Sequence, residues 1–482
     1  MSTDWKSVLP IGGGKRYQVL AEGLADAILS GRIAAGAQLP THRDMAHRLG
    51  LSVSTVTRAY AELQSRGLLV NRVGSGSFVS SLAGSDPAAG ADADKKPSRR
   101  GAGSALEALD GSLRDTSGLI DLSFNEALMG PAARSVQKGL TELLTVADVR
   151  TLTGSQPVAG SVAQREAGAA WLNFIGVHAH PDEIVLVPGS QGCLATVLMA
   201  LCNNGDAILT EGLTWPGIVT VANIANVRIR PVAMDAGGLA PEDLDRACRE
   251  YRPRLLYTMP TLHNPTSITA SLERRKAIVA VAQKHDLTIV EDDAYGFLLA
   301  TPLPSYFELL PEKTIYVTSL SKAVAASIRV GFVAARARLQ RQLLPALRAI
   351  TMMTSPIVAE IATRLINNGA AMRAAWDQSE TLAQRQVLLD AILGPRPASE
   401  LSPSMHRWFE LDDHWDSTGF AAEAFRLGVS VAAGPLFSAT PGHDPRAVRI
   451  SLGGDPDDKR LKRALVTLAG LARGRASVRP IT

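Results

Sequence analysis

The first eighty residues alternate short helical patterns with chain breaks. Apolar side chains recur at helical spacing in residues 15–30, 41–49 and 52–66. Thr41 is placed to cap the second helix and Gly50 to end it, and either Ser52 or Ser54 can cap the third. Residues 68–80 then supply two β-rich runs around a Gly-Ser-Gly turn, which predicts a hairpin. Two short helices joined by a glycine-containing turn and followed by a hairpin are the layout of a winged helix-turn-helix.

From about Ile120 a different pattern begins, in which strand-like apolar runs alternate with helical stretches. The runs are EIVLVPG, DAILTEG, RIRPVAM, RLLYTMP, TIVEDDAY, TIYVTSLSK and RVGFVAA. Seven short strands separated by helices predict an α/β sheet with ligand-binding groups at the strand ends. From about Leu401 the runs HRWFELD, VSVAAG and AVRISLG mix with helices and predict a smaller α+β part.

Between these patterns lies the stretch SLAGSDPAAGADADKKPSRRGAGS, which has small, charged and breaker residues without an apolar period. Such a composition is typical of a flexible linker, and a linker of about 30 residues would be unusual inside a compact domain. We therefore predict a helix-turn-helix domain at 1–80, a linker at 81–117 and a second body at 118–482.

The amino-acid composition is that of a globular protein with one basic end. Of the 482 residues, 46% are hydrophobic and 20% are charged, which excludes a disordered or fibrous chain. Residues 1–80 hold nine Lys and Arg against five Asp and Glu, and this excess of four equals the net charge of the whole chain. The basic end is therefore the candidate for contact with a polyanion.

The cysteines and the apolar runs bear on the cellular compartment. Cys193, Cys202 and Cys248 are odd in number and lack paired metal-ligand spacing, so we expect neither a disulfide framework nor a metal site. No stretch reaches the roughly 18 apolar residues of a membrane helix, and the N-terminus has no apolar signal core. We expect a cytoplasmic protein.

The third N-terminal helix is the candidate DNA reader, because the second helix of a helix-turn-helix enters the major groove. Its candidate contacts to bases or phosphates are Ser52, Ser54, Thr55, Thr57 and Arg58. Arg43 can reach a phosphate or a guanine edge from the preceding helix, and Gly76, in the turn of the hairpin, is a further candidate DNA contact. The alternative is a small protein-interaction module in which Arg43 and Arg58 are solvated charges. The hairpin, the spacing and the local charge favour DNA binding.

Residues 30–79 resemble the winged-helix domain of GntR-type regulators over its whole length. Many relatives have Arg at the second position of the recognition helix, where this chain has Val53. An apolar side chain can contact a thymine methyl group but cannot make a bidentate contact with guanine. The resemblance therefore implies DNA binding with a different base contact at this step.

The second body carries candidate chemistry at its strand ends. Lys322 directly follows the run TIYVTSLS, where its amine can form an imine with an aldehyde cofactor. Groups that can bind a phosphate lie at strand ends as well: Gly189, Ser190 and Gln191, which open a helix, together with Ser319, Ser321 and Arg329.

Four further residues match the ring of the same cofactor. A buried Asp292 would hold a pyridine nitrogen protonated, Tyr295 and Asn264 can bond a ring hydroxyl, and Trp215 can stack on the ring face. Ordinary alternatives exist: Asp292 can be a helix cap, Trp215 a core side chain and Asn264-Pro265 a turn. Lys322 can be a solvated lysine. Their joint occurrence at strand ends favours a pyridoxal phosphate site.

Residues 120–475 resemble fold-type I aminotransferases of class I. The resemblance implies a mainly parallel seven-stranded sheet, with a large part at about 170–370 and a small part at about 380–482 joined by the N-terminal segment of the body. It implies Lys322 as the Schiff-base lysine, with Asp292 and Tyr295 completing the catalytic set. It also implies these cofactor contacts: Ser190, Gln191, Trp215, Asn264, Ser319, Ser321 and Arg329. Arg449 matches the arginine that binds a substrate carboxylate; the alternative is a surface charge on a strand.

Two segments depart from this family. Relatives commonly have a Tyr-Gly-Asp-Pro-like segment that reaches the site of the partner subunit, where this chain has Thr153-Gly154-Ser155-Gln156 and so lacks the tyrosine hydroxyl. The glycine pair before a strand of the small part is replaced by Ser404 and Met405. We expect these two residues to reshape the substrate side of the site.

A winged helix joined by a linker to an aminotransferase-like body is the organisation of the MocR/GabR branch of GntR regulators, which the whole chain resembles. The resemblance implies a homodimeric, head-to-tail transcription regulator that binds an operator in double-stranded DNA. It would hold pyridoxal phosphate on Lys322 and sense the cofactor, an amine or an amino acid, without a need for full transamination. The alternatives are a metabolic aminotransferase with an accessory DNA-binding domain and a regulator whose body is a scaffold without cofactor.

Overall fold

The computed structural model describes residues 16–29, 32–33, 37–65, 68–72, 76–79, 118–146, 152–395, 403–453 and 457–474. The chain divides into two compact units, Met1–Pro97 and Ser98–Thr482. The predicted linker at 81–117 lies outside the described residues.

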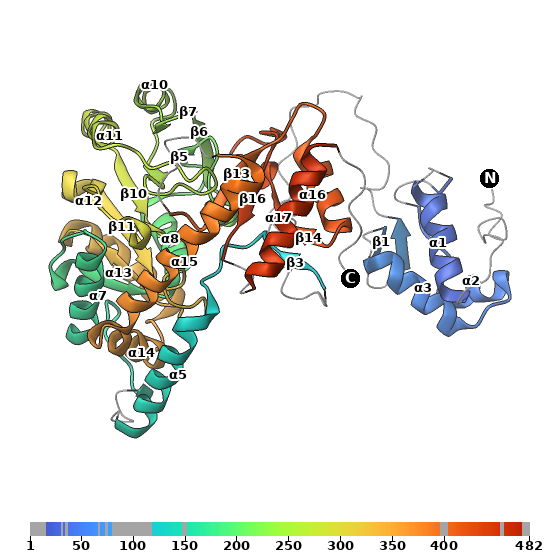
Figure 1. The fold of residues 1–482 in the computed structure, drawn as a ribbon, viewed down its shortest axis with the longest axis horizontal. Coiled ribbons are helices and arrows are strands. Elements are labelled where there is room, and N and C mark those ends of the chain that lie inside the picture. Colours follow the sequence, from blue (N-terminus) through green and yellow to red (C-terminus); the bar gives the residue numbers. More distant parts are fainter. Residues whose placement is uncertain are drawn as a thin grey trace. The chain divides into compact units, whose positions relative to one another are not determined.

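The described residues of the first unit form three helices and a hairpin (Figure 1). They are α1 (Arg16–Leu29), α2 (His42–Leu49), α3 (Val53–Ser65), β1 (Leu69–Arg72) and β2 (Gly76–Val79). Thr41 caps α2 by accepting a hydrogen bond from the backbone N–H of Asp44 at 3.2 Å, and Gly50 ends the helix with φ of 64°. Ser52 begins α3, because its Oγ accepts from the N–H of Thr55 at 3.2 Å. The predicted winged helix-turn-helix is confirmed.

The core of the first unit comes from the helical spacing of its apolar residues. Leu20 and Leu24 of α1 and Val56 and Leu63 of α3 are fully buried in one hydrophobic cluster. Because residues three and four apart lie on one helix face, each helix turns a single apolar stripe inward and leaves its polar residues outside. Ser52 and Ser54, at the start of α3, thus remain exposed while Val56 packs in the core.

A seven-stranded sheet forms the centre of the second unit. Its strands, in spatial order, are β4 (Ile184–Val187), β12 (Gly331–Ala334), β11 (Thr314–Ser319), β10 (Thr288–Asp292), β9 (Leu255–Thr258), β5 (Ala207–Glu211) and β6 (Arg228–Val232). All seven match the strands predicted from the apolar runs. Six run parallel to one another, and β12 alone is antiparallel to its neighbours β11 and β4.

The direction of β12 determines at which edge of the sheet the residues before this strand lie. The carboxyl ends of six strands meet at one edge of the sheet, and the segment that enters β12 starts from this same edge. Residues that follow β4, β5, β9, β10 and β11 therefore lie near the residue that precedes β12, which is where ligands bind in open α/β sheets.

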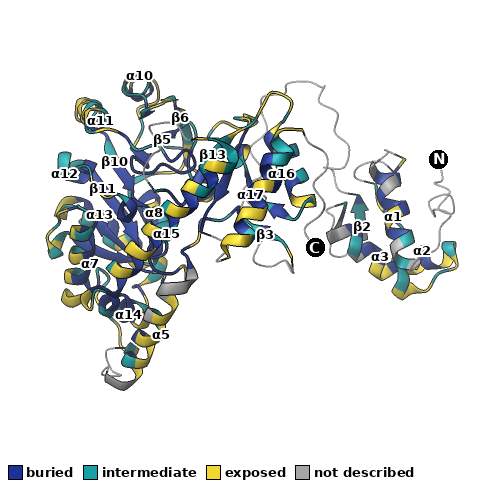
Figure 2. Cartoon of the chain, in the orientation of Figure 1, coloured by how far each residue is buried: buried dark blue, intermediate teal, exposed yellow. Residues whose placement is uncertain are grey.

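Two hydrophobic cores cover the faces of the sheet. In β9, Leu255 and Tyr257 belong to one cluster and Leu256 to another, and β10 divides its residues in the same way between Val290 and Ile289. Successive side chains of a strand point to opposite faces, so each run of consecutive apolar residues supplies both cores. Figure 2 shows the central strands buried, the edge strand β6 partly exposed, and the outer sides of the surrounding helices exposed.

The helices of the second unit surround this sheet and the small part. They are α5 (Met129–Val146), α7 (Val162–Phe174), α8 (Gly189–Leu201), α9 (Pro216–Ile224), α10 (Pro241–Tyr251), α11 (Leu272–Lys284), α12 (Tyr306–Leu309), α13 (Ala337–Thr351), α14 (Pro356–Asn367), α15 (Ala370–Leu393), α16 (Ser417–Arg426) and α17 (Asp458–Ala472). A short antiparallel pair, β7 (Met234–Asp235) and β8 (Gly238–Leu239), lies beyond β6.

The small part contains a three-stranded antiparallel sheet of β13 (His406–Glu410), β16 (Ala447–Ser451) and β15 (Ala432–Ala433). The predicted run at 429–434 forms two short strands, because β14 (Val429–Ser430) pairs instead with β3 (Ile120–Asp121) in parallel. Leu122 extends the connection, since its carbonyl accepts from the N–H of Ser451 at 2.7 Å. The start of the described second unit is therefore hydrogen-bonded to the small part through β3 and Leu122.

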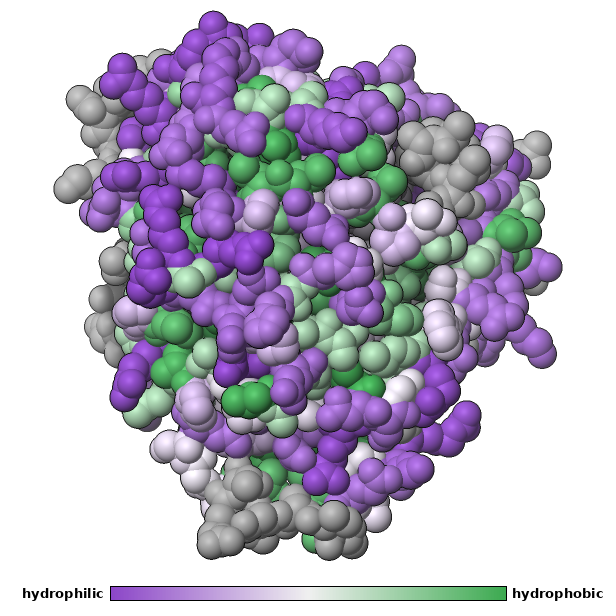
Figure 3. All heavy atoms as spheres, turned by 90° about the vertical axis from the view of Figure 1, so that its left-hand side faces the viewer, coloured by the Kyte–Doolittle hydropathy of each residue, from purple (hydrophilic) through white to green (hydrophobic). Residues whose placement is uncertain are grey.

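The face of the molecule that lies to the left in Figure 1 is mainly hydrophilic, with smaller hydrophobic areas in its hollows (Figure 3). Among the described helices, none has the length and apolar character needed to cross a membrane.

Candidate functional site

A cavity of about 460 Å³ lies at the carboxyl edge of the large sheet. Its lining includes these residues that the sequence predicts for the cofactor: Ser190, Gln191, Trp215, Asn264, Asp292, Tyr295, Ser319, Ser321, Lys322 and Arg329. Arg449, from β16 of the small part, lines it as well. These residues span 260 positions of the chain, and the sheet topology brings them to one place.

One end of the cavity is suited to a phosphate. Helix α8 begins there without a side-chain cap, so its first backbone N–H groups are available to an anion together with Ser190 and Gln191. Gly189 has φ of 78°, and a Cβ at this position would lie 3.2 Å from Nη2 of Arg329. Glycine therefore permits both the turn into α8 and the close approach of Arg329.

Lys322 lies half-buried in the loop after β11 and lines the cavity. Burial and the positive charge of Arg449 lower the pKa of Lys322 to about 8, against the opposing charge of Glu126. Its Nζ donates a hydrogen bond to the carbonyl of Asn125. Gln378 of α15 holds the loop by donating to the carbonyl of Lys322 at 2.9 Å. A lowered pKa leaves a substantial fraction of the amine neutral and nucleophilic near neutral pH.

Asp292 is the last residue of β10 and is 3% exposed. Its Oδ2 accepts a hydrogen bond from the hydroxyl of Tyr257 at 2.8 Å, and its Oδ1 is buried without a hydrogen-bond partner among the described residues. Burial raises the pKa of Asp292 to about 7. A carboxyl group in this state would be stabilised by a cationic N–H donor in the cavity.

Two asparagines bind the phenol oxygen of Tyr295. Asn125 donates from Nδ2 at 2.9 Å and Asn264 from Nδ2 at 3.5 Å. Arg449 fixes the amide of Asn264 by donating to its Oδ1 at 2.9 Å. With two donors directed at its oxygen, Tyr295 is left to donate its own hydrogen elsewhere.

His406 of β13 fixes the other amide. Its Nε2 lies 3.1 Å from the carbonyl of His263, which can only accept, so Nε2 carries the hydrogen. Burial holds the pKa of His406 well below its ordinary value, so the ring is neutral and Nδ1 accepts from Nδ2 of Asn125 at 2.8 Å. The small sheet thus orients both amides around Tyr295.

Arg449 is 5% exposed and has neutral partners. Besides Asn264, its guanidinium donates to the carbonyl of Ser123, and its Cζ lies 4.8 Å from the ring centre of Phe437. Its Nε has no hydrogen-bond partner among the described residues. Burial lowers the pKa of Arg449 to about 10. The group remains a cation whose charge is only partly satisfied.

Trp215 caps α9 and depends on a neighbouring glycine. A Cβ on Gly217 would lie 2.1 Å from the indole of Trp215, so only glycine lets the ring lie against the backbone at this point. The N–H of Thr214 donates to the carbonyl of Phe437 at 2.7 Å, which attaches the small part to this loop. The packing places an aromatic face in the cavity wall.

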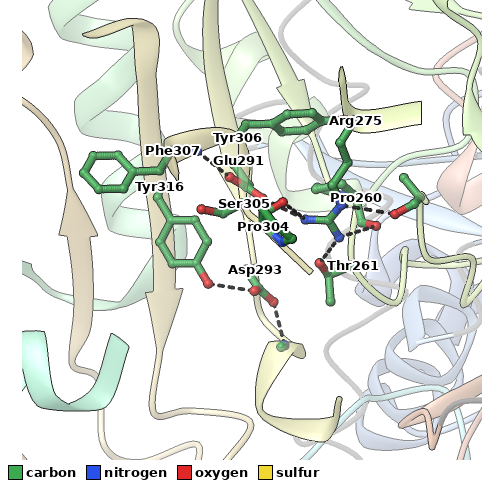
Figure 4. Close-up of polar contacts among 12 residues, drawn as sticks. Pro260, Thr261, Arg275, Glu291, Asp293, Pro304, Ser305, Tyr306, Phe307 and Tyr316 are labelled. Carbon is green, nitrogen blue, oxygen red and sulfur yellow. Dashed lines mark hydrogen bonds and ion pairs between the residues drawn. The ribbon is translucent and has the colours of Figure 1, made fainter. Parts of the chain in front are cut away.

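A second buried polar cluster lies around the strand end that carries Asp292 (Figure 4). Arg275 of α11 is 1% exposed and lies 3.6 Å from Oε1 of Glu291. It also donates to three backbone carbonyls and to Oγ1 of Thr261 at 2.8 Å. On the other side, Asp293 accepts from the hydroxyl of Tyr316 at 2.6 Å and from the N–H of Gly296 at 2.5 Å. These contacts fix the turn that presents Asp292.

Sequence reasoning missed several residues of the site. Asn125, Tyr257, Phe437, Gln378 and His406 contact or line the cavity residues. Tyr257 could have been found from the sequence, because it places a hydroxyl group in the apolar run that forms β9, the strand beside β10. No local signal marks Asn125 or His406, because their contacts join segments 281 positions apart.

In the first unit, the DNA contacts stay predictions, and the structure shows how exposed the candidate residues are. Arg43 is exposed in the first turn of α2, and Ser52, Ser54, Thr57 and Arg58 are exposed around the start and first turns of α3. Thr55 is half-buried, and Gly76 begins β2. Thr57 already donates its hydroxyl to the carbonyl of Val53 at 2.9 Å. Val53 is 46% exposed, so the departure from arginine lies on the surface.

Comparison with known proteins adds the family. Residues 117–466 match the model described as aminotransferase class I and II. The chain belongs to this aminotransferase family. Residues 16–79 match the model of the bacterial regulatory proteins of the gntR family. This aminotransferase-family chain therefore carries a GntR-type helix-turn-helix domain, which is the MocR-type architecture.

Three relatives of this aminotransferase-family chain illustrate both parts. The HTH-type transcriptional regulator YdeF of Bacillus subtilis is 28% identical over 467 residues, which cover 97% of this chain and 96% of YdeF. An aromatic amino acid aminotransferase of Schizosaccharomyces pombe is 30% identical over 55% of this chain and 67% of the relative. The crystal structure of an archaeal alanine:glyoxylate aminotransferase has a TM-score of 0.70 at 23% identity, covering 79% of this chain and 96% of that chain. The second unit thus has the aminotransferase fold.

The two departures from the family occupy different places. Gln156 accepts from the side-chain amide of Gln164 at 2.8 Å, within its own chain. Ser404 bonds Ser267 at 2.9 Å, and Met405 is fully buried. Neither Ser404 nor Met405 lines the cavity among the described residues. Oγ of Ser404 accepts from the N–H of His406 at 3.3 Å, and the expectation that the two residues reshape the substrate side stays a prediction.

Proposed function

We propose that the protein is a transcription regulator that binds operator DNA through its GntR-type domain and senses an amine or amino acid through pyridoxal phosphate held on Lys322. The observation that carries the proposal is the meeting of Lys322, Asp292 and Arg329 in one cavity of a chain that also carries a winged helix-turn-helix. The architecture is that of HTH-type regulators with an aminotransferase-like domain.

The residues present fit the cofactor. The unpartnered Oδ1 of buried Asp292 and the raised pKa of its carboxyl call for a cationic N–H donor, which a protonated pyridine supplies. The uncapped start of α8 and Arg329 would hold the phosphate, and Lys322 the aldehyde carbon. When bound, pyridoxal phosphate supplies an aldehyde that exchanges amines and a ring that accepts electrons.

The chain's own residues would then do three things. Tyr295 would donate its hydroxyl hydrogen to the ring oxygen, because Asn125 and Asn264 already bond its phenol oxygen. Arg449 would bind the carboxylate of an amino acid, and Lys322 would be freed when that amine takes its place. Such a ligand changes DNA affinity only as far as it binds two conformations of the protein differently.

An operator titration tests the proposal. DNA selected from a random library by the full-length protein is titrated at fixed salt, with and without pyridoxal phosphate and with a panel of amino acids. We expect specific binding whose Kd changes when cofactor and an amino acid are both present. Specific DNA binding that ignores both would favour a scaffold body.

A metabolic aminotransferase is the second candidate, favoured by the complete set of site residues in the cavity. Multiple-turnover kinetics with an amino acid and an oxo acid distinguish the two functions. Robust turnover in a chain without specific DNA affinity would reject the regulator.

Head-to-tail dimerisation is part of the proposal, because it would place two winged helices on paired half-sites. Analytical ultracentrifugation measures whether the protein is a dimer.

Arg43→Ala should weaken operator binding, because the exposed guanidinium in the first turn of α2 would lose its contact with DNA. If the contact is to a phosphate, the slope of log K against log salt should fall by about one unit. Arg48→Ala, which removes the same charge from the other end of α2, is the matched control. Equal affinity of the Arg43 variant and the wild type would show that Arg43 does not contact the operator.

Loading of the cofactor should depend on pH through Lys322. Below a pKa of about 8 the group is mainly an ammonium ion without a free electron pair, and above it the amine is mainly neutral. The bimolecular rate constant for loading should therefore rise with pH and level off above about 8. Stopped-flow absorbance between pH 6 and 10 measures it. A rate constant that decreases across this range would contradict the prediction.

A further inference from the structure

The ring of His406 is held in one place and in one tautomer. Its backbone is fixed in β13, where Oγ of Ser267 donates to its carbonyl at 3.0 Å and its N–H donates to Oγ of Ser404 at 3.3 Å. Nε2 of the ring lies 3.1 Å from the carbonyl of His263. Because a carbonyl can only accept, Nε2 carries the hydrogen, and Nδ1 of the neutral ring is left as an acceptor.

The side-chain amide of Asn125 turns the same end toward two groups. Its Nδ2 lies 2.8 Å from Nδ1 of His406 and 2.9 Å from the phenol oxygen of Tyr295. A phenol can donate or accept, so Tyr295 would tolerate either end of the amide, whereas Nδ1 can only accept. Oδ1 of Asn125 has no hydrogen-bond partner among the described residues. Within the described part of the chain, His406 therefore decides which end of the amide faces the phenol.

The orientation of this amide decides where the hydroxyl hydrogen of Tyr295 points. With Nδ2 toward the phenol, the oxygen accepts from Asn125 and, at 3.5 Å, from Asn264. The hydroxyl hydrogen is then left for an acceptor in the cavity, which Tyr295 lines. In the reversed amide, Oδ1 would accept that hydrogen, and Oδ1 and Nδ1 of His406 would face each other as two buried acceptors. Such a pair is unfavourable because neither acceptor has a hydrogen to share.

We propose that His406 is a positioning residue, which through Nδ1 holds the amide of Asn125 in the orientation that keeps the hydroxyl hydrogen of Tyr295 available to the cavity. The connected side chains of Asn125, Tyr295 and His406 belong to residues at most 4% exposed, so water does not compete for these hydrogen bonds. The inference deepens the proposed function and rests on it for the acceptor, which is the ring oxygen of pyridoxal phosphate. The tautomer of His406 does not depend on the cofactor.

Two substitutions separate the acceptor at Nδ1 from the rest of the side chain. In His406→Asn the amide oxygen can take the place of Nδ1 and accept from Asn125. In His406→Gln the amide reaches the place of Nε2 and leaves no acceptor near the place of Nδ1. Both variants lose the ring that packs edge-to-face on Tyr295 with centroids 5.5 Å apart, so lost packing affects both alike. Tyr295→Phe is the reference for a ring that donates no hydrogen.

The first readout is the midpoint pH at which the absorbance of the lysine-bound cofactor changes. A hydrogen donated by Tyr295 stabilises negative charge on the ring oxygen, so its loss should raise this midpoint. We expect His406→Gln to raise it by at least about half a pH unit and His406→Asn to stay near the wild type. Adding His406→Gln to Tyr295→Phe should cause no further rise, because both changes remove the same hydrogen bond. Equal midpoints for the Asn and Gln variants, or shifts that add in the double variant, would overturn the proposal.

The second readout needs no cofactor. Nitrogen NMR of the full chain with isotope-labelled histidine reports the tautomer, and His406→Asn identifies the signals of His406 by their loss. We expect a neutral ring with its hydrogen on Nε2, and a hydrogen on Nδ1 near neutral pH would overturn the proposal. Tryptophan fluorescence during unfolding checks that the variants fold. Wild-type protein that never acquires the absorbance of lysine-bound cofactor is a failure of the proposed function alone, and the tautomer then decides whether His406 offers Asn125 an acceptor.

Discussion

Lys322→Ala should abolish covalent retention of pyridoxal phosphate, so that the cofactor is lost on gel filtration and the absorbance of the lysine-bound form disappears. The phosphate and ring contacts remain, so weak reversible binding should persist. We expect the apparent affinity to fall by about a hundredfold or more, or roughly 2.7 kcal/mol. Absorbance after gel filtration and a fluorescence titration measure the two effects.

Lys284→Ala is the matched control, because it also removes a lysine from the second unit but at an exposed position paired with Asp245. It should retain the absorbance of the wild type. A Lys322 variant that keeps this absorbance would show that the cofactor is attached elsewhere, and wild-type protein without it would favour the scaffold.

Arg275→Met should lower the free energy of unfolding of the second unit by about 3–5 kcal/mol, because it leaves Glu291 buried without its cation and several carbonyls without a donor. Burial raises the pKa of Glu291 to about 8 even beside Arg275, so protonation of Glu291 relieves part of this cost. Denaturant unfolding followed by tryptophan fluorescence reports mainly on this unit, since five of the six tryptophans lie in residues 118–482.

Arg274, the residue before Arg275, provides the matched control for this prediction. Arg274 also pairs with an aspartate, Asp235 at 2.8 Å, but near the surface, so Arg274→Met should cost no more than about 1 kcal/mol. Adding Glu291→Gln to Arg275→Met should recover part of the lost stability, because the uncompensated carboxylate is removed. Equal losses for the Arg274 and Arg275 variants would refute the assigned importance of the buried pair.

The strand-end residues could be predicted because one rule covers them all. Apolar runs identify the strands, and parallel strands bring the residues that follow them to one edge. Lys322, Asp292 and Ser190 meet for this reason. Arg329 joins them because β12 is antiparallel, so that the segment entering this strand, with Arg329 two residues before Gly331, lies at the same edge.

The residues that the sequence did not reveal depend on contacts without local periodicity. Asn125 follows a two-residue strand, and its place beside Lys322 arises only when β3 pairs with β14. His406 acquires its role from the carbonyl of His263 and the amide of Asn125, in two distant segments. Hydrophobic pattern determines which face of an element is buried, but not which polar groups meet across elements.

The pairing of β3 with β14 gives the second unit a particular entry. The chain arrives from residues 81–117, passes through β3, and within five residues reaches the carbonyls of Ser123 and Asn125, which accept hydrogen bonds from Arg449 and Lys322. The two side chains that a ligand would engage are therefore the ones that hold the first described segment of the second unit in place. A molecule that drew Arg449 and Lys322 away would leave the carbonyls of Ser123 and Asn125 without these donors, so occupation of the cavity and the attachment of this segment depend on the same hydrogen bonds.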